Sequence, residues 1–336
     1  MLLNRISVFS SRATIGAIAL SAVLLGTVAT AEPDTILKMG HAGSTTTPGH
    51  VAMEQVDAEL RARTEGRVGI EIFPSAQLGG ERELIESIQL GNVDMAFVSS
   101  APLAAFSPSF YVMDMPFLFK DRETVYGVLD GEIGQEMLAG LSQVGILGLG
   151  YWENGFRQLT NDKHEVRTLD DLAGLKMRTM ENEVHIAAWR AVGANPAPLS
   201  FGELFTALQQ GTFDAMEGPI NLFHSMKFNE VQHFISRTNH IYSPLVLLMN
   251  PDTAAQLSPE DLATLKAVIH EATPAQRAMT TKADDLAIAA MPNVKISDLT
   301  AEELAAFSSK MGPVYDIVKE KAGADLVDRI VDAASK

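Results

Sequence analysis

The chain has 336 residues, of which 46% are hydrophobic and 20% are charged. These values are ordinary for a soluble globular protein and argue against a disordered chain, and the length is sufficient for two lobes with separate cores. A formal net charge of -16, without a cluster of Lys and Arg, argues against a nucleic-acid-binding protein.

The first 31 residues have the three parts of a secretory signal peptide. Arg5 and Arg12 precede an uncharged, mostly apolar run that ends in Ala29-Thr30-Ala31. The alternative is an uncleaved membrane anchor, but the run is shorter than the roughly 20 residues of a spanning helix. We therefore predict a cleaved signal peptide over residues 1–31 and a free, soluble, periplasmic protein that starts at Glu32. Because the chain contains no Cys, a lipid anchor on cysteine and any disulfide are excluded.

The N-terminal part after the signal peptide alternates strand and helix patterns. Apolar residues recur with the period of a helix in two segments, and they alternate or form short runs, as in strands, in three others. We expect helices over residues 48–64 and 81–90, and strands over residues 36–41, 68–73 and 94–100. A strand–helix–strand–helix–strand order implies a largely parallel sheet covered by helices.

The same alternation returns after Tyr151. We expect strands over residues 175–180 and 212–216 and helices over residues 183–192 and 201–210. The β-rich stretch 236–250 is expected to return to the first lobe. A helical pattern then begins at Ser258-Pro259 and runs to about Ala290, which is long enough to bridge both lobes.

These patterns predict an α/β protein that forms a clam-shell of two lobes, each a mostly parallel sheet flanked by helices. We place lobe I over residues 32–154 plus about 243–282, and lobe II over residues 155–242 plus about 283–336. Ligands of open α/β sheets bind beyond the carboxyl ends of the strands. Short polar stretches follow several predicted strands, namely 41–47, 99–106, 178–182 and 216–223.

The sequence lacks the motifs of the common catalytic and metal-binding sites. HEATP at 270–274 begins like the HExxH zinc motif, but Pro274 stands where the second His must be. Residues 145–150 lack the spacing of a dinucleotide-binding turn, and there is no P-loop and no G-x-S-x-G elbow. We therefore expect no cofactor, no metal and no enzymatic activity.

Two arginines remain to be explained. Arg178 lies near the end of an apolar strand, and Arg157 lies among aromatic and polar residues in YWENGFRQLTN. A guanidinium is costly to bury unpaired, and its planar fork matches a carboxylate. The alternative is a structural salt bridge to a neighbouring Asp or Glu. Because both arginines lie in strand-end segments of one lobe, we favour a binding site for an organic acid.

Several segments, in order and with consistent spacing, resemble one family. They run from about Ile36 to beyond Asn250 and read PSAQLGGERELIESIQLGNVDMAF, DMPFLF, GFRQLTN, GLKMRTMEN, GANPAPLSFGELFTALQQGTFDAMEGP and KFNEVQHFISRTNH. This series is similar to the periplasmic solute-binding proteins of TRAP transporters, of the C4-dicarboxylate-binding type. The resemblance implies a two-lobed protein that closes on an organic acid and delivers it to a sodium-driven membrane permease.

The resemblance also implies roles for particular residues. Arg178 matches an Arg that clamps the ligand carboxylate, and Arg157 matches a second Arg that assists. Phe201 matches an aromatic residue that packs on the ligand. His41, Glu81 and Ser99 fall where related binders place polar groups.

One position departs from the family pattern. Many relatives carry Asn in a Q-E-N-P segment, where this chain reads MEGP, so Gly218 contributes no side chain. This departure argues against sialic acid as the ligand. Glu217 or Asn221 would reshape the wall at this point, and a cation that bridges Glu217 to the acid stays an alternative.

We expect a sugar acid such as a uronate or an aldonate, with a small dicarboxylate as the second choice. A periplasmic enzyme that acts on such acids is the alternative from another class. The complete set of predicted ligand-binding residues is Arg178, Arg157, Phe201, His41, Glu81, Ser99, Ser100, Trp152, Asn154, Glu217 and Asn221.

Overall fold

A mixed sheet of ten strands forms the centre of the computed structural model, which describes residues 33–336. The predicted signal peptide lies outside the described residues. One strand, β4 (Leu147–Asn161), is long enough to belong to both halves of this sheet. Its first part pairs with β9 (Tyr242–Met249), and its last part pairs with β7 (Ala215–Pro219), in both cases antiparallel.

The first half of the sheet contains three parallel strands near the N-terminus. They are β1 (Thr35–Gly40), β2 (Val68–Phe73) and β3 (Met95–Ser99), with β1 between the other two. Strand β9 pairs antiparallel with β3 and joins this group to β4. Helices α1 (Pro48–Arg63) and α2 (Glu81–Gln89) connect the parallel strands. The apolar face of α1, with Met53, Val56 and Leu60, lies in the same core as Leu37 and Met39 of β1.

The second half contains two sets of parallel strands. In one set, β5 (Lys176–Thr179) lies between β6 (Asn195–Pro198) and β7. In the other, β8 (Phe234–Arg237) pairs with β10 (Lys295–Asp298), and β8 also pairs antiparallel with β4. The helices of this half are α6 (Glu183–Ala191), α7 (Leu204–Gln209) and α8 (Ile220–Ser225), together with short 3-10 turns η3 (Asp170–Leu172), η4 (Phe201–Glu203) and η5 (Phe228–Glu230).

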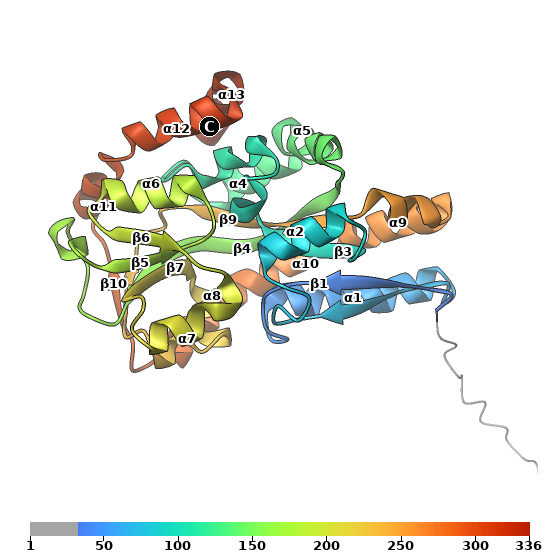
Figure 1. Ribbon diagram of the computed structural model, residues 1–336, viewed down its shortest axis with the longest axis horizontal. Helices are drawn as coiled ribbons and strands as arrows, with labels where there is room; N and C mark the ends of the chain where they lie inside the picture. The colour runs from blue at the N-terminus through green and yellow to red at the C-terminus, as the bar shows by residue number, and fades with distance from the viewer. Residues whose placement is uncertain (1–32) are drawn as a thin grey trace, which may run out of the picture. The chain divides into compact units, whose positions relative to one another are not determined.

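The long helix predicted from Ser258 is confirmed as α10 (Pro259–Ala290), which has 32 residues. It contacts α1 in the first half of the sheet and α8 in the second, as Figure 1 shows. Leu265, Val268 and Ile269 of α10 belong to the core with α1, and Ala287 belongs to the core with α7 and α8. The helix therefore links the two halves.

The remaining elements are helices and 3-10 turns. Residues 100–144 form α3 (Ser100–Leu103), η1 (Pro108–Asp114), α4 (Arg122–Asp130), α5 (Glu132–Gly140) and η2 (Leu141–Val144). Helix α9 (Pro251–Gln256) precedes α10, and α11 (Ala301–Ser308), α12 (Gly312–Ala322) and α13 (Ala324–Ala334) end the chain. Within residues 33–336 no helix combines the length and apolar composition needed to cross a membrane.

The predicted α/β class and the parallel order of β1, β2 and β3 are confirmed. The sheet is mixed, rather than mostly parallel throughout, because β9 and β4 lie antiparallel to their neighbours between the parallel sets. Helix α12 contacts η1 and α6, and α13 contacts α4, so the C-terminal helices also touch the region that we assign to lobe I. The residue boundaries of the two lobes stay a prediction.

Candidate functional site

A pocket lies where the carboxyl ends of β3, β5 and β7 approach β4. This is the place where open α/β sheets bind ligands. Strand β4 contributes Glu153, Asn154 and Arg157 to its wall. Other predicted site residues that line the pocket are Glu81, Ser99, Arg178, Phe201, Glu217 and Asn221.

Three predicted site residues lie outside this lining. The ring of His41 stacks on Phe97 at 4.5 Å between ring centroids, and Phe97 rather than His41 faces the pocket. Trp152 is buried in the core of the first half of the sheet, where its ring centroid lies 6.1 Å from that of Phe97. Ser100 is fully buried at the start of α3. These three residues support the wall rather than form it.

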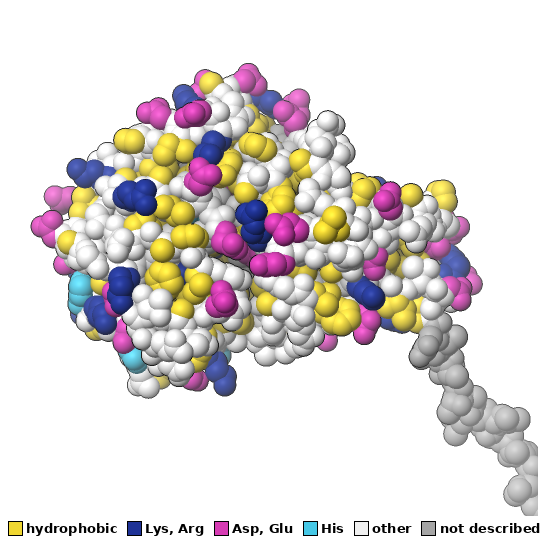
Figure 2. Space-filling view, viewed as in Figure 1, with side chains coloured by type: hydrophobic (Ala, Val, Ile, Leu, Met, Phe, Trp, Pro, Cys, Tyr) yellow, Lys and Arg dark blue, Asp and Glu magenta, His cyan; other side chains and the backbone are white. Residues whose placement is uncertain are grey.

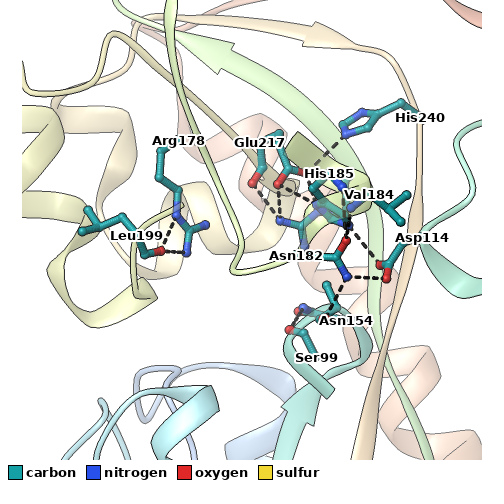
Figure 3. A network of polar contacts seen from close by, with 12 residues as sticks. Ser99, Asp114, Asn154, Arg178, Asn182, Val184, His185, Leu199, Glu217 and His240 are labelled. Carbon is teal, nitrogen blue, oxygen red and sulfur yellow. Dashed lines mark hydrogen bonds and ion pairs between the residues drawn. The ribbon is translucent and has the colours of Figure 1, made fainter. Parts of the chain in front are cut away.

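Arg178 is 2% exposed and projects from β5. Its Nε and Nη2 atoms donate hydrogen bonds to the backbone oxygen of Leu199, at 2.8 and 2.6 Å. Figure 3 shows this guanidinium apart from the cluster around Glu217. Within residues 33–336 no Asp or Glu oxygen lies within ion-pair distance of it. Burial, only partly offset by the charge of Glu217, lowers the pKa of Arg178 to about 10.

Arg157 is 3% exposed and differs from Arg178 in having a carboxylate partner. Its Nη2 atom lies 2.8 Å from Oε1 of Glu217, and its Nε atom donates to Oε2 of the same side chain. The Nη2 atom also donates to the backbone oxygen of Glu217 at 2.9 Å. The register of β4 and β7, in which Arg157 is opposite Pro219, brings these side chains together. Arg157 is therefore paired within the protein, and its predicted contact with a ligand stays a prediction.

The Arg157–Glu217 pair belongs to a larger buried network (Figure 3). Nε2 of His240 lies 3.2 Å from Oε2 of Glu217, and Nδ1 of His185 lies 3.6 Å from Oε1. On its other side His185 lies 3.0 Å from Asp114. Burial alone would raise the pKa of Glu217, but Arg157 and the two histidines outweigh it and hold this pKa well below its usual value. The Glu217 carboxylate is therefore an anion whose charge is compensated inside the protein.

Sequence reasoning missed Asp114, His185 and His240. Asn182 binds Asp114 at 2.7 Å and also caps α6 by accepting from the backbone N–H groups of Val184 and His185. Burial would lower the pKa of His185, but Asp114 and Glu217 outweigh this effect and raise it. The one available signal was a polar residue in an apolar segment, since Asp114 interrupts YVMDMPF.

Another part of the pocket lining is a series of hydrogen-bonded side chains, namely Glu81, Ser99, Asn154 and Asn221. Oε1 of Glu81 accepts hydrogen bonds from the backbone N–H and the hydroxyl of Ser99, at 2.7 and 2.9 Å. Asn154 donates to the Ser99 hydroxyl at 3.4 Å, and Asn221 donates to the Asn154 carbonyl at 3.3 Å. Burial raises the pKa of Glu81, against the Ser99 hydrogen bonds and the charges of Arg178 and Arg157.

Glu153 lies between the pocket and the long helix. Its carboxylate binds the Nε atom of Arg122 at 2.5 Å and also accepts from the Tyr126 hydroxyl. Asp284 of α10 shares Arg122 at 2.5 Å and accepts from Asn221 at 2.7 Å. Burial raises the pKa of Asp284 to about 6, although Asn221 and Arg122 favour its charged form.

Gly218 has ordinary backbone geometry, because its φ lies outside the left-handed region. An added Cβ there would lie 3.5 Å from the Met216 methyl and 3.9 Å from Nη2 of Arg157, which are ordinary contacts. The wall therefore has room beside the Arg157–Glu217 pair. Across residues 33–336 no cluster of three His, Cys, Asp or Glu side chains is arranged to hold a metal ion. Because Glu217 is already paired, its geometry gives no support to a bridging cation.

Known proteins resemble this chain over most of its length. The family model described as bacterial extracellular solute-binding protein, family 7 (DctP), matches residues 39–321. The 2,3-diketo-L-gulonate-binding periplasmic protein YiaO of Escherichia coli is 37% identical over 297 residues, 88% of this chain and 90% of the relative. The C4-dicarboxylate-binding periplasmic protein DctP of Rhodobacter capsulatus is 33% identical over 332 residues, 96% of this chain and 98% of the relative.

A solved structure shows the same fold. It is the sugar acid binding protein DctPAm of Advenella mimigardefordensis in complex with galactonate, with a TM-score of 0.88 and 34% identity. The match covers 90% of this chain and 98% of that chain.

Proposed function

Since the chain belongs to family 7 of the bacterial extracellular solute-binding proteins, the DctP family of TRAP transporters, we propose that it captures a small organic acid and delivers it to a sodium-driven permease. Members of the family are periplasmic substrate-binding transport proteins rather than enzymes. They bind small organic acids and work with TRAP membrane permeases. We propose the same role for this chain, without catalysis of its own.

The observation that carries this proposal is the state of Arg178. It is a buried cation in a pocket, held by the Leu199 carbonyl and without a carboxylate partner among the described residues. A buried charge is costly unless it is paired, and a guanidinium pairs best with a planar anion. A ligand carboxylate would supply the missing partner. Phe201, whose ring centroid is 6.0 Å from Cζ of Arg178, would pack on the same part of the ligand.

We propose a sugar acid, such as an aldonate or a uronate, as the ligand. Glu81, Ser99 and Asn154 line the same pocket as Arg178 and offer hydrogen-bonding groups, which suits the hydroxyl groups of such an acid. Relatives named for 2,3-diketo-L-gulonate and solved with galactonate support this class. A C4-dicarboxylate is the second candidate, because the Rhodobacter capsulatus relative is named for it.

A thermal-shift screen against aldonates, uronates, keto sugar acids and C4-dicarboxylates tests the proposal. A ligand present at 1,000 times its Kd stabilises the folded state by about 4 kcal/mol, so a cognate acid should raise Tm clearly. Calorimetry should then give one site per chain, and NMR should recover the acid unchanged after prolonged incubation. If no acid in the panel raises Tm, the proposed function is wrong, and if a bound acid is converted, the protein is an enzyme.

We also propose that the protein reaches the periplasm by cleavage after Ala31. Expression of the full chain in a Gram-negative host, followed by N-terminal sequencing of the periplasmic fraction, should give a start at Glu32. A start at Met1 in the membrane fraction would instead identify an uncleaved anchor.

A further inference from the structure

Most charged side chains around the pocket lie next to one of opposite charge. Glu217 binds Arg157, and Arg122 binds both Glu153 and Asp284. Among the charged residues that line the pocket, Arg178 and Glu81 are left without a partner of opposite charge within the described part of the chain. These two residues therefore determine which charged groups of a ligand the pocket accepts, and at which positions on the ligand.

Arg178 and Glu81 come from the two halves of the sheet. Arg178 projects from β5, and Glu81 is the first residue of α2, next to the Ser99 end of β3. One oxygen of Glu81 already accepts two hydrogen bonds from Ser99. The other, Oε2, has no hydrogen-bond donor within residues 33–336. Burial raises the pKa of Glu81, but the hydrogen bonds from Ser99 and the positive charges of Arg178 and Arg157 favour its ionised form. An ionised carboxylate accepts hydrogen bonds and donates none, so this oxygen suits a ligand hydroxyl.

We propose that the pocket takes an acid with a single carboxylate and rejects one that carries a second carboxylate at the far end, and that Glu81 is the residue that discriminates. This inference rests on the proposed function. The ligand carboxylate binds Arg178, and the distal hydroxyl groups donate to Glu81. In a dicarboxylate of the same length, the second carboxylate would face Glu81 in a partly desolvated pocket. Two like charges repel strongly there, and neither supplies a proton for a hydrogen bond.

Matched pairs of acids provide the test. Galactonate and galactarate differ only at C6, which carries a hydroxyl in one and a carboxylate in the other, and D-erythronate and meso-tartrate form the corresponding four-carbon pair. Calorimetry at pH 7.5 should show that the wild-type protein binds the better aldonate at least about 100-fold more tightly than its aldarate. Glu81→Gln keeps the shape of the side chain and removes its charge. This variant should reduce the ratio of the affinities for the aldonate and its aldarate at least tenfold, mainly by binding the aldarate more tightly.

A control variant removes a charge from the same helix away from the pocket. Glu86 of α2 is exposed and pairs with Arg82 on the surface, so Glu86→Gln should leave the ratio unchanged. A wild-type ratio within threefold would overturn the inference even if Glu81→Gln failed to fold. A folded Glu81→Gln variant with the wild-type ratio would also overturn it.

Different outcomes test the proposed function and the role of Glu81. If both members of a pair bind equally well and Arg178→Lys loses both, the proposed function stands and only the role of Glu81 is wrong. If no member of either pair and no other acid binds, the proposed function is wrong, and the inference falls with it.

Discussion

Arg178 and Arg157 are equally buried, but a carboxylate neutralises only Arg157. The difference follows from sheet register, because β4 and β7 bring Glu217 to Arg157, whereas Arg178 on β5 reaches the Leu199 carbonyl. A carbonyl oxygen satisfies hydrogen-bond donors without cancelling the charge. Sheet register thus gives the two buried arginines different partners, so that Arg157 has a carboxylate and Arg178 has only a carbonyl oxygen.

Replacement of Arg178 by Lys should weaken binding of the cognate acid strongly. The ammonium keeps the charge but cannot form the two parallel hydrogen bonds of a guanidinium. Loss of a partner in a desolvated charge contact costs about 2–5 kcal/mol, or roughly 30- to 4,000-fold in affinity. Calorimetry on the acid found by thermal shift measures this change, and affinity within twofold of wild type would contradict the role of Arg178.

The Arg157–Glu217 pair should act on stability as a unit. Removal of one partner leaves a buried charge without compensation, so Arg157→Met and Glu217→Met should each lower the free energy of unfolding by roughly 3–5 kcal/mol. The double variant should lose much less than the sum of the two. Urea unfolding of all four proteins without ligand gives the coupling energy. Additive losses would show that the two side chains act independently.

Among the elements, the sequence predicted best those with a clear period. Strands β1, β2 and β3 and helix α10 have apolar spacings and start signals that identify them, such as Ser258 capping α10 through the Asp261 backbone N–H. Strand β4 was harder, because Gly150 and Gly155 have positive φ and accompany register shifts that break its alternation. No helix was predicted between residues 100 and 144, although α4 and α5 have nine residues each, as α2 has.

The candidate site could be predicted only where burial of a single residue without a partner would be unfavourable. Two arginines in apolar segments pointed to a carboxylate, but the sequence did not show which of them is paired. His185 and Asp114 are 71 residues apart, and His240 lies 23 residues beyond Glu217. Such contacts depend on the three-dimensional packing of η1, α6 and β7, which local patterns do not contain.

Two loops from opposite halves of the sheet meet beside the pocket. One contains residues 74–80, before α2, and the other contains residues 199–203, which include the carbonyl that holds Arg178. An added Cβ on Gly80 would lie 2.5 Å from the Ser200 hydroxyl, and one on Gly202 would lie 3.3 Å from Cβ of Ala76. Both distances are shorter than normal contacts, so these glycines allow the loops to approach.

A large side chain at Gly80 should therefore hold the loops apart. Gly80→Leu should weaken binding of the cognate acid about tenfold or more, because the added side chain prevents the close approach of the loops beside the pocket. Gly127→Leu is the matched control, since Gly127 lies on α4 with nothing within 4 Å of an added Cβ. Calorimetry and thermal unfolding of both variants make the comparison. Equal affinities for Gly80→Leu and wild type would show that the approach of the loops is not needed for binding.

At the scale of the whole molecule, three elements connect the two halves of the sheet. They are α10, β4 and β9, and each contributes to the pocket lining, with Thr280, Asn154 and Leu245 respectively. Strand β4 passes from its pairing with β9 to its pairing with β7 close to Gly155, where φ is 125° and the register shifts. A bulged glycine can absorb a change in backbone angle at low cost, so this point is suited to a hinge. In the view of Figure 2, acidic and basic side chains are interspersed around the middle of the molecule, where the halves meet.

Ligand binding should close the two halves around this connection. Arg178 and Glu81 lie in different halves, so an acid that contacts both would link the two halves. The closed form then has contacts that the open form lacks, and this difference in affinity is what shifts a conformational equilibrium. Small-angle scattering should show a smaller radius of gyration at saturating acid, and no change for Arg178→Lys at the same concentration. An unchanged profile for the wild-type protein with bound acid would indicate a rigid pocket that ligands enter without closure.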